Sequence, residues 1–186
     1  MLANIAIGML ETSSIAKGVE ATDAMCKMAS VELVKATIVA RGKYTILIKG
    51  PVGEVESSLR AGANIAGKTV VDQFILRNVH QQVLDSLDKR RPVAALDALG
   101  LIETKEAIAA VRAADAAAKA AHVHLLETKV VVGGGKGYVS MTGEVAAVRT
   151  AVGAGIATVP DGGLVSPSPV GVPMDKEAYP SPTPSP

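Results

Sequence analysis

The stretch IAIGMLETSSIAKGVEATDAMCKMASVEL, residues 5–33, occurs twice in this chain. It returns as GLIETKEAIAAVRAADAAAKAAHVHL from Gly100, displaced by 92 positions, so that Lys27 corresponds to Lys119. A period near 90 residues is too long for one unit of a stacked solenoid, so the repeat predicts two tandem domains.

The later part of the repeat follows a displacement of 93 positions, which carries Gly42 to Gly135 and Gly50 to Gly143. One residue has therefore been inserted in the second copy. We expect this residue to lengthen a single loop.

The repeat and the composition divide the chain into four segments: a first domain (3–88), a linker (89–97), a second domain (98–174) and a Pro-rich disordered tail (175–186). Eight of the ten prolines lie at or after position 160. A proline-rich segment cannot bury enough apolar surface to offset the entropy lost on ordering, so we predict the tail to be disordered.

Each copy is predicted to run strand, helix, strand, strand, helix, strand. IAIGMLE is an apolar run typical of a strand, and apolar positions at spacings of three to five over residues 14–29 favour a helix with one buried face. Ser13 or Ser14 can cap that helix, and QQVLDSL predicts a short helix after the closing strand. The order indicates an α+β fold, with helices on one face of an antiparallel sheet.

The composition disfavours several function classes. With one Phe, three Tyr and no Trp, burial rests on aliphatic residues, which favour close helix and sheet contacts over deep ligand pockets. The 19 basic and 18 acidic residues nearly cancel, so no overall field favours nucleic acid or an anionic membrane. Lys89, Arg90 and Arg91 form a basic run that we interpret as a solvated connector.

Cys26 is the only cysteine, which excludes an intramolecular disulfide and favours a reducing compartment. Its place between Met25 and Lys27 in a helical pattern is typical of a small core or interface residue rather than a nucleophile. The first residues lack a signal-peptide pattern, and the apolar stretch 107–126 is interrupted by charges. We therefore expect a cytosolic protein.

The repeated stretch 5–33, the segment ARGKYTILIKG (40–50) and the segment VVDQFILRNVH (70–80) resemble the BMC domains of bacterial microcompartment shell proteins, here two in tandem and non-permuted. The resemblance covers most of residues 3–158. It implies ferredoxin-like α/β sandwich domains and a homotrimer whose six domains form a pseudohexameric tile. It also implies a structural, non-enzymatic role without a cofactor in the bacterial cytoplasm. Other BMC shell proteins at the tile edges and encapsulated enzymes are the implied partners, and nucleic acid and membrane are not.

The resemblance places pore-lining loops at Ala40, Arg41 and Gly42 and at Gly133, Gly134 and Gly135. Glycine suits loops that approach a symmetry axis closely, although glycine-rich sequence is also normal for a hairpin turn. Three copies of Arg41 around an axis would favour anions, whereas an Arg41 paired with a carboxylate would leave a neutral opening. The run GGGK lacks the spacing of a phosphate-binding loop, so we disfavour phosphate binding.

Lys27 and Lys119 occupy the family's edge-lysine position in the pattern D-A-x-x-K, where the side chain crosses the seam between tiles. The ordinary alternative is a solvated helix lysine. His80 matches a histidine near the end of the family's last strand, which predicts a structural hydrogen bond. His122 and His124 share one face of a predicted strand, but without a third ligand we favour a surface or core role over a metal site.

Two other functions stay open. Some tandem-domain relatives hold an iron–sulfur cluster through a cysteine in the first pore loop, and the matching residue here is Ala40. Because such clusters require thiolate ligands, we disfavour an electron-relay role. A free trimeric metabolite-binding regulator could have a similar small α+β sandwich, but it would stay dispersed in solution and never form sheets.

Overall fold

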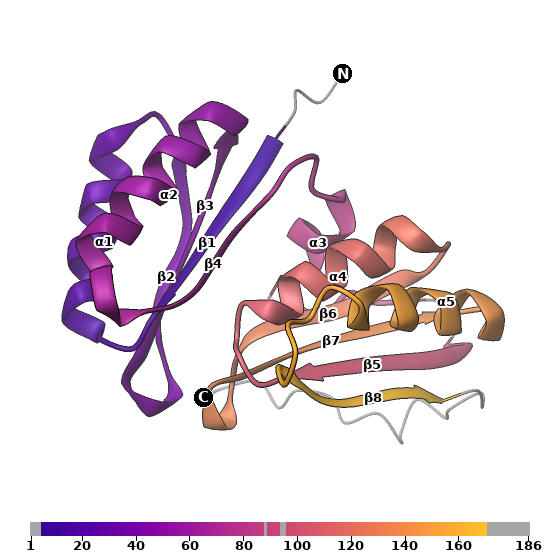
Figure 1. The fold of residues 1–186 in the computed structure, drawn as a ribbon. Coiled ribbons are helices and arrows are strands. Elements are labelled where there is room, and N and C mark those ends of the chain that lie inside the picture. The colour runs from indigo at the N-terminus through magenta and orange to yellow at the C-terminus, as the bar shows by residue number, and fades with distance from the viewer. Residues whose placement is uncertain (1–4, 88, 94–95, 171–186) are drawn as a thin grey trace.

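Figure 1 shows the computed structural model of the chain, which describes residues 5–87, 89–93 and 96–170. Two similar units follow one another. The tail predicted at 175–186 lies outside the described residues.

The first unit contains β1 (Ile5–Thr12), α1 (Ile15–Met28), β2 (Glu32–Val39), the 3₁₀ turn η1 (Ala40–Gly42), β3 (Lys43–Pro51), α2 (Val52–Ala66), the 3₁₀ turn η2 (Gly67–Thr69), β4 (Val70–Leu76) and α3 (Gln81–Ser86). The second unit contains β5 (Ala98–Thr104), α4 (Ala109–Ala120), β6 (His124–Val132), the 3₁₀ turn η3 (Gly133–Gly135), β7 (Lys136–Gly143), α5 (Val145–Ile156) and β8 (Leu164–Val170). The predicted order of strands and helices is confirmed in both copies.

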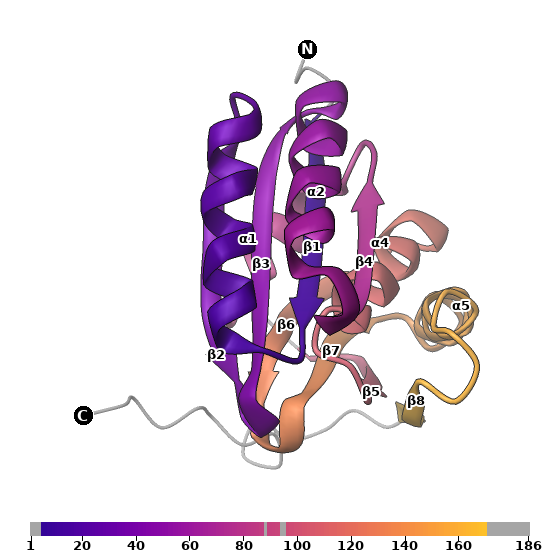
Figure 2. The same ribbon diagram turned by 60° about the vertical axis from the view of Figure 1, so that its left-hand side comes forward.

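Each unit has a four-stranded antiparallel sheet, with strand order β2-β3-β1-β4 in the first and β6-β7-β5-β8 in the second. In the first unit α1 and α2 cover the same face of the sheet (Figures 1 and 2). The fold is therefore α+β, as predicted. No helix within the described ranges is long and apolar enough to cross a membrane.

The extra residue of the second copy lies in a strand, so the prediction of a longer loop was wrong. The turns η1 and η3 both span three residues. Strands β2 and β3 stay in register up to the pair Val39 and Lys43, whereas the register of β6 against β7 shifts between Lys129 and Val132. An additional residue in one strand of an antiparallel pair is accommodated by such an irregularity, which leaves the turn unchanged.

Capping groups begin two of the helices. Ser14 is the N-cap of α1, and its hydroxyl oxygen accepts a hydrogen bond from the backbone N–H of Lys17 at 3.4 Å, which confirms the predicted cap. His80 is the N-cap of α3, where its Nδ1 accepts from the backbone N–H of Gln82 at 3.3 Å. His80 therefore has a structural role, although it lies beyond the end of β4.

A close helix–strand contact is kept in both units by glycine at different positions. A Cβ on Gly18 of α1 would lie 2.5 Å from the ring of Tyr44 on β3. The corresponding residues of the second unit are Ala110 on α4 and Gly137 on β7, where a Cβ on the glycine would lie 2.8 Å from the Ala110 side chain. The residue that has a side chain at this contact lies on the strand in the first unit and on the helix in the second, and glycine faces it in both.

The two units share a continuous core. Ile7, Met9 and Leu47 lie on the face of the first sheet opposite α1 and α2, and they belong to the same buried cluster as Val111 and Ala114 of α4. The helix α4 is therefore buried between its own sheet and the back of the first sheet. This contact fixes the second unit against the first.

Candidate functional site: paired loops and two open surfaces

The two predicted pore loops lie side by side. A Cβ built on Gly135 would be 3.3 Å from the carbonyl oxygen of Ala40, so η1 and η3 touch. Figure 2 shows the β2–β3 and β6–β7 connections together at the same end of the molecule. The structure thus brings all six predicted pore residues into one place, from positions about 90 residues apart in the sequence.

Both turns use left-handed backbone conformations. The φ angles are 67° at Arg41 and 69° at Gly42, and 78° at Gly134 and 75° at Gly135. Glycine adopts these angles freely, whereas a residue with a Cβ loses about 1 kcal/mol or more there. Arg41 therefore keeps a strained backbone at the position where the second copy has glycine, and such strain is concentrated at functional sites.

The Arg41 side chain is exposed. Within the described ranges, no carboxylate forms an ion pair with this guanidinium group. The turn therefore presents a positive charge to solvent at the tip of η1.

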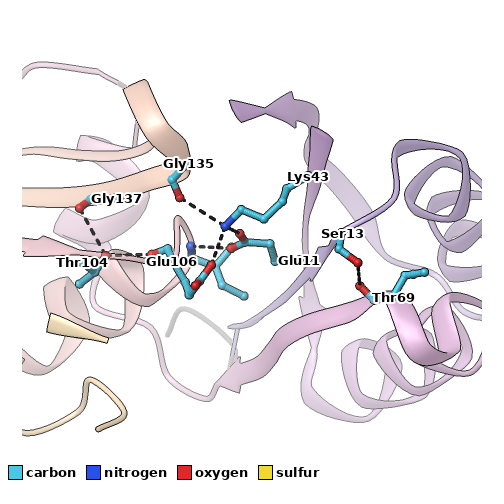
Figure 3. A network of polar contacts seen from close by, with 9 residues as sticks. Glu11, Ser13, Lys43, Thr69, Thr104, Glu106, Gly135 and Gly137 are labelled. Carbon is cyan, nitrogen blue, oxygen red and sulfur yellow. Dashed lines mark hydrogen bonds and ion pairs between the residues drawn. The ribbon is translucent and has the colours of Figure 1, made fainter. Parts of the chain in front are cut away.

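Lys43, which follows η1, points away from the loop tip into the contact between the two units (Figure 3). Its ammonium group lies 2.5 Å from a carboxylate oxygen of Glu11 and 2.5 Å from one of Glu106, and it donates to the carbonyl of Gly135 at 3.5 Å. The other oxygen of Glu11 accepts from the backbone N–H of Ile108 at 3.3 Å. These contacts join β1 and β3 of the first unit to the start of α4.

Burial and the ion pairs shift the pKa values of Glu11 and Lys43. Burial raises the pKa of Glu11 above 4.5, although the ammonium of Lys43 and the N–H of Ile108 oppose the change. Burial alone would lower the pKa of Lys43, but its hydrogen bonds and charge attraction to Glu106 and Glu11 outweigh burial and raise the pKa above 10.5.

We expect this ion pair to make the protein sensitive to alkaline pH. A lysine whose pKa is raised by folding contributes stability that is complete below its unfolded pKa, near 10.5, and is lost as the pH rises through the folded value. The free energy of unfolding in urea should therefore fall more steeply above pH 10.5 in the wild type than in Lys43→Met. Parallel curves for the two proteins would show that Lys43 does not titrate with a raised pKa.

The second unit repeats this pair on an open surface. Glu103 and Lys136 correspond to Glu11 and Lys43, and they form an ion pair at 2.8 Å. Both side chains are 38% exposed, whereas those of Glu11 and Lys43 are 0% and 10% exposed. The difference arises because α4 covers the first pair and no described residue covers the second in the same way.

The helix α1 exposes the surface that corresponds to the one by which α4 packs against the first sheet. Ile15, Val19, Thr22 and Cys26 form one stripe along α1, called the α1 stripe, with the spacing of a single helical face. Val19 is 52% exposed, whereas the corresponding Val111 of α4 is 0% exposed. The α1 stripe is thus open at the positions where α4 is packed against the back of the first sheet.

The two predicted edge lysines make the same local ion pair. Lys27 lies 2.7 Å from Asp23, and Lys119 lies 2.5 Å from Asp115, both one helical turn earlier. Lys27 is the more exposed, because Lys119 also approaches the carbonyl oxygen of Arg77 at the end of β4, at 3.5 Å.

The remaining candidates make no site. The rings of His122 and His124 lie edge to face with centroids 5.8 Å apart, and the described residues contain no cluster of three His, Cys, Asp or Glu side chains placed to hold a metal ion. The basic run is only partly solvated: Lys89 is exposed, but Arg91 pairs with Asp85 at 3.5 Å.

The ion-pair group of Glu11, Lys43 and Glu106 was not predicted. The signal was present, because Glu11 and Lys43 both recur in the second copy as Glu103 and Lys136. Sequence alone does not reveal that one copy of the pair is buried at a contact between units, since that depends on how the units pack.

Comparison with known proteins agrees with the duplicated fold. The BMC domain family matches residues 6–79 and again residues 98–170. The bacterial microcompartment shell protein PduT of Citrobacter freundii is 40% identical over 148 residues, which are 79% of this chain and 80% of that protein. The major carboxysome shell protein CsoS1A of Halothiobacillus neapolitanus is 40% identical over 88 residues, 46% of this chain and 90% of that protein.

Solved structures show the same similarity. A microcompartment protein from Desulfitobacterium hafniense superposes with a TM-score of 0.84 and 43% identity, covering 95% of this chain and 99% of that chain. A fused permuted hexameric shell protein of the RMM microcompartment shares the fold, with a TM-score of 0.65 and 22% identity over 85% of each chain. The chain therefore belongs to the BMC domain family of microcompartment shell proteins.

Proposed function

We propose that three copies of this chain form a pseudohexameric tile of a bacterial microcompartment shell, with a central pore made by η1 and η3. The role is structural rather than enzymatic, in the bacterial cytoplasm. Other BMC shell proteins are its neighbours at the tile edges, and encapsulated enzymes lie beneath the shell. The observation that carries the proposal is that one chain exposes both surfaces of the kind that meet between its own two units. These surfaces are the α1 stripe and the surface around Glu103 and Lys136.

The contact inside the chain supplies the pattern for the contact between chains. Within one copy, α4 packs on the back of the first sheet, and the backbone N–H of its N-cap residue Ile108 donates to Glu11. By the repeat, α1 of a second copy would pack on the back of the second sheet, where Glu103 takes the place of Glu11. A contact between two different surfaces of the same chain is heterologous, and it closes a ring when the rotation at each step divides the circle.

Such a ring would gather the loops at its centre. Because η1 and η3 already touch within one copy, repeating the contact would continue the row of loops around the axis, alternating between the two kinds. The exposed Arg41 of each copy would then lie beside the opening.

Electron microscopy of the purified protein tests the assembly. A shell tile should form extended sheets with tiles packed edge to edge. A free metabolite-binding regulator would give dispersed particles at every concentration and salt condition tried, and that result would contradict the proposed function.

We expect Lys27→Ala combined with Lys119→Ala to impair sheet formation while leaving trimers intact. At a tile edge the long lysine stem packs against the neighbour, so its removal costs apolar contact as well as charge. Sheets can be counted by electron microscopy, and the oligomer measured by native mass spectrometry. Lys68→Ala, on the turn η2, is the control for removing an exposed lysine. If the double variant tiles like the wild type, the edge assignment is wrong.

We expect Arg41→Glu to change the charge preference of the pore. Three guanidinium groups favour anions, and three carboxylates in their place would disfavour them. In reconstituted shells the entry of an anionic substrate should slow by roughly tenfold relative to a neutral one, equivalent to about 1.4 kcal/mol. Arg60→Glu, on the exposed face of α2, introduces the same charge change away from the loops. Unchanged relative permeability in Arg41→Glu would remove Arg41 from the pore.

A further inference from the structure

The edge strands β2 and β6 occupy the same place in the two sheets but differ in burial. Leu33 of β2 is 41% exposed, whereas the corresponding Leu125 of β6 is 1% exposed. The next residue repeats the contrast, since Val34 is 38% exposed and Leu126 is 1% exposed. Among the described residues, a segment therefore covers β6 and none covers β2 in the same way.

That segment is the stretch of chain that leaves the first sheet after β4. Gln82 of α3 accepts a hydrogen bond from the backbone N–H of Leu125 at 2.8 Å and donates to the carbonyl of Val123 at 3.0 Å. Further along, the hydroxyls of Ser86 and Thr128 are 3.0 Å apart. Residues 82–87 thus run along the outer edge of β6 and satisfy some of its unpaired backbone groups.

The residues that follow α3 complete the cover. The backbone N–H of Arg91 donates to the carbonyl of Leu126 at 2.7 Å, and Val93 and Leu96 pack against the Leu126 side chain. The segment that leaves the first sheet therefore covers the outer edge of the second sheet, which is the next sheet in the ring. It does not cover the edge of its own sheet.

A groove adjoins the start of β2 at Glu32. It has a volume of about 1010 Å³ and opens beside the start of the strand, lined in part by Ile5, Val31, Lys49, Pro51 and Val52. Apolar surface on a strand edge favours pairing with another segment, and edges of this kind are normally covered.

The repeat identifies the segment that would occupy this groove. Gly8 pairs with Ile75 of β4 and Gly100 with Pro169 of β8, so a displacement of 94 positions relates the two closing strands. The residues after β8 then correspond to those that run from β4 onto β6. They include the apolar Met174, Ala178 and Tyr179.

We propose that residues 171–186 of one copy, which include the tail predicted to be disordered on its own, bind along β2 of the next copy and cover Leu33. The inference rests on the proposed ring, because the next sheet after β8 belongs to a second copy. Its consequence is a strap that passes between neighbouring chains at every contact between copies.

Hydrogen exchange on a truncated chain tests the strap. In a variant ending at Val170, backbone amides of residues 31–36 should exchange at least tenfold faster than in full-length trimers, while those of β6 should be unchanged. Native mass spectrometry of both samples shows whether the ring persists. Equal exchange in two intact trimers would overturn the strap and leave the ring standing, whereas a full-length protein that is monomeric would overturn the ring and the strap together.

Cross-linking of the full-length protein keeps the proposal testable if the truncated chain does not fold. Lys176 is the only lysine in residues 171–186, Lys35 lies on β2, and Lys49 of β3 lines the groove. A short amine-reactive cross-linker applied to a mixture of ¹⁴N and ¹⁵N copies that have exchanged subunits should join Lys176 to Lys35 or Lys49 with mixed isotopes. Lys176→Arg should abolish this product. Cross-links to those lysines with unmixed isotopes only, or none, would overturn the strap.

Discussion

Replacing Lys43 with methionine is expected to destabilise the folded protein by about 3 to 5 kcal/mol, because it leaves a buried carboxylate without its counter-charge. Glu11 is fully buried and has Lys43 as its ion-pair partner, whereas Glu106 is partly exposed and can be solvated by water. Urea unfolding at a fixed protomer concentration measures the change, since assembly contributes to the apparent stability.

Two further variants distinguish the cost of leaving Glu11 buried without a counter-charge from the cost of removing a lysine in general. Lys49→Met lies on the same strand and removes an exposed ion pair with Glu32 at 2.9 Å, so it should cost at most about 1 kcal/mol. Adding Glu11→Gln to Lys43→Met removes the uncompensated charge and should recover part of the loss. If Lys43→Met is as stable as Lys49→Met, the ion pair of Glu11 and Lys43 is solvated by water, which would contradict its burial in the structure.

Placing a charge on the α1 stripe is expected to dissociate the ring. Val19 corresponds to Val111, which is fully buried where α4 meets the first sheet, so Val19→Glu would bury an unpaired carboxylate at each contact between copies. We expect the affinity between copies to fall at least about a thousandfold, or roughly 4 kcal/mol, as measured by sedimentation over a range of concentrations.

The control is Ile65→Glu, which changes an apolar residue of α2 that is 43% exposed and lies outside the α1 stripe. Cys26 reports on the same surface, since it lies on the α1 stripe and is exposed in the single chain. A thiol reagent should label Cys26 slowly in the wild type and in Ile65→Glu, and rapidly in Val19→Glu. Rapid labelling of the wild type at concentrations where it is trimeric would place the contact elsewhere.

The fold could be predicted from the sequence because its determinants are local. The apolar run and the helical spacing within residues 5–33 predict a strand and a helix, and Ser14 caps that helix as expected. The inserted residue was misplaced for a related reason. Aligning the two copies places it between Val39 and Gly135, which is compatible with a longer turn or an irregular strand, and only the pairing of β6 with β7 decides between them.

The loops of the candidate site were located by the family resemblance, and glycine allows the left-handed backbone at Gly42, Gly134 and Gly135. The burial of the Lys43 ion pair could not be predicted, since Glu11 and Glu103 stand in nearly the same sequence context. What separates them is the packing of α4 on one sheet and its absence from the other, a long-range contact between units.

The central claim is that three copies close a ring by repeating the contact found within one chain. Native mass spectrometry of the purified protein at micromolar concentration tests it most directly. We predict a species of three times the 18.9 kDa chain mass that persists on dilution. A stable monomer at that concentration would contradict the ring, the pore and the tile together.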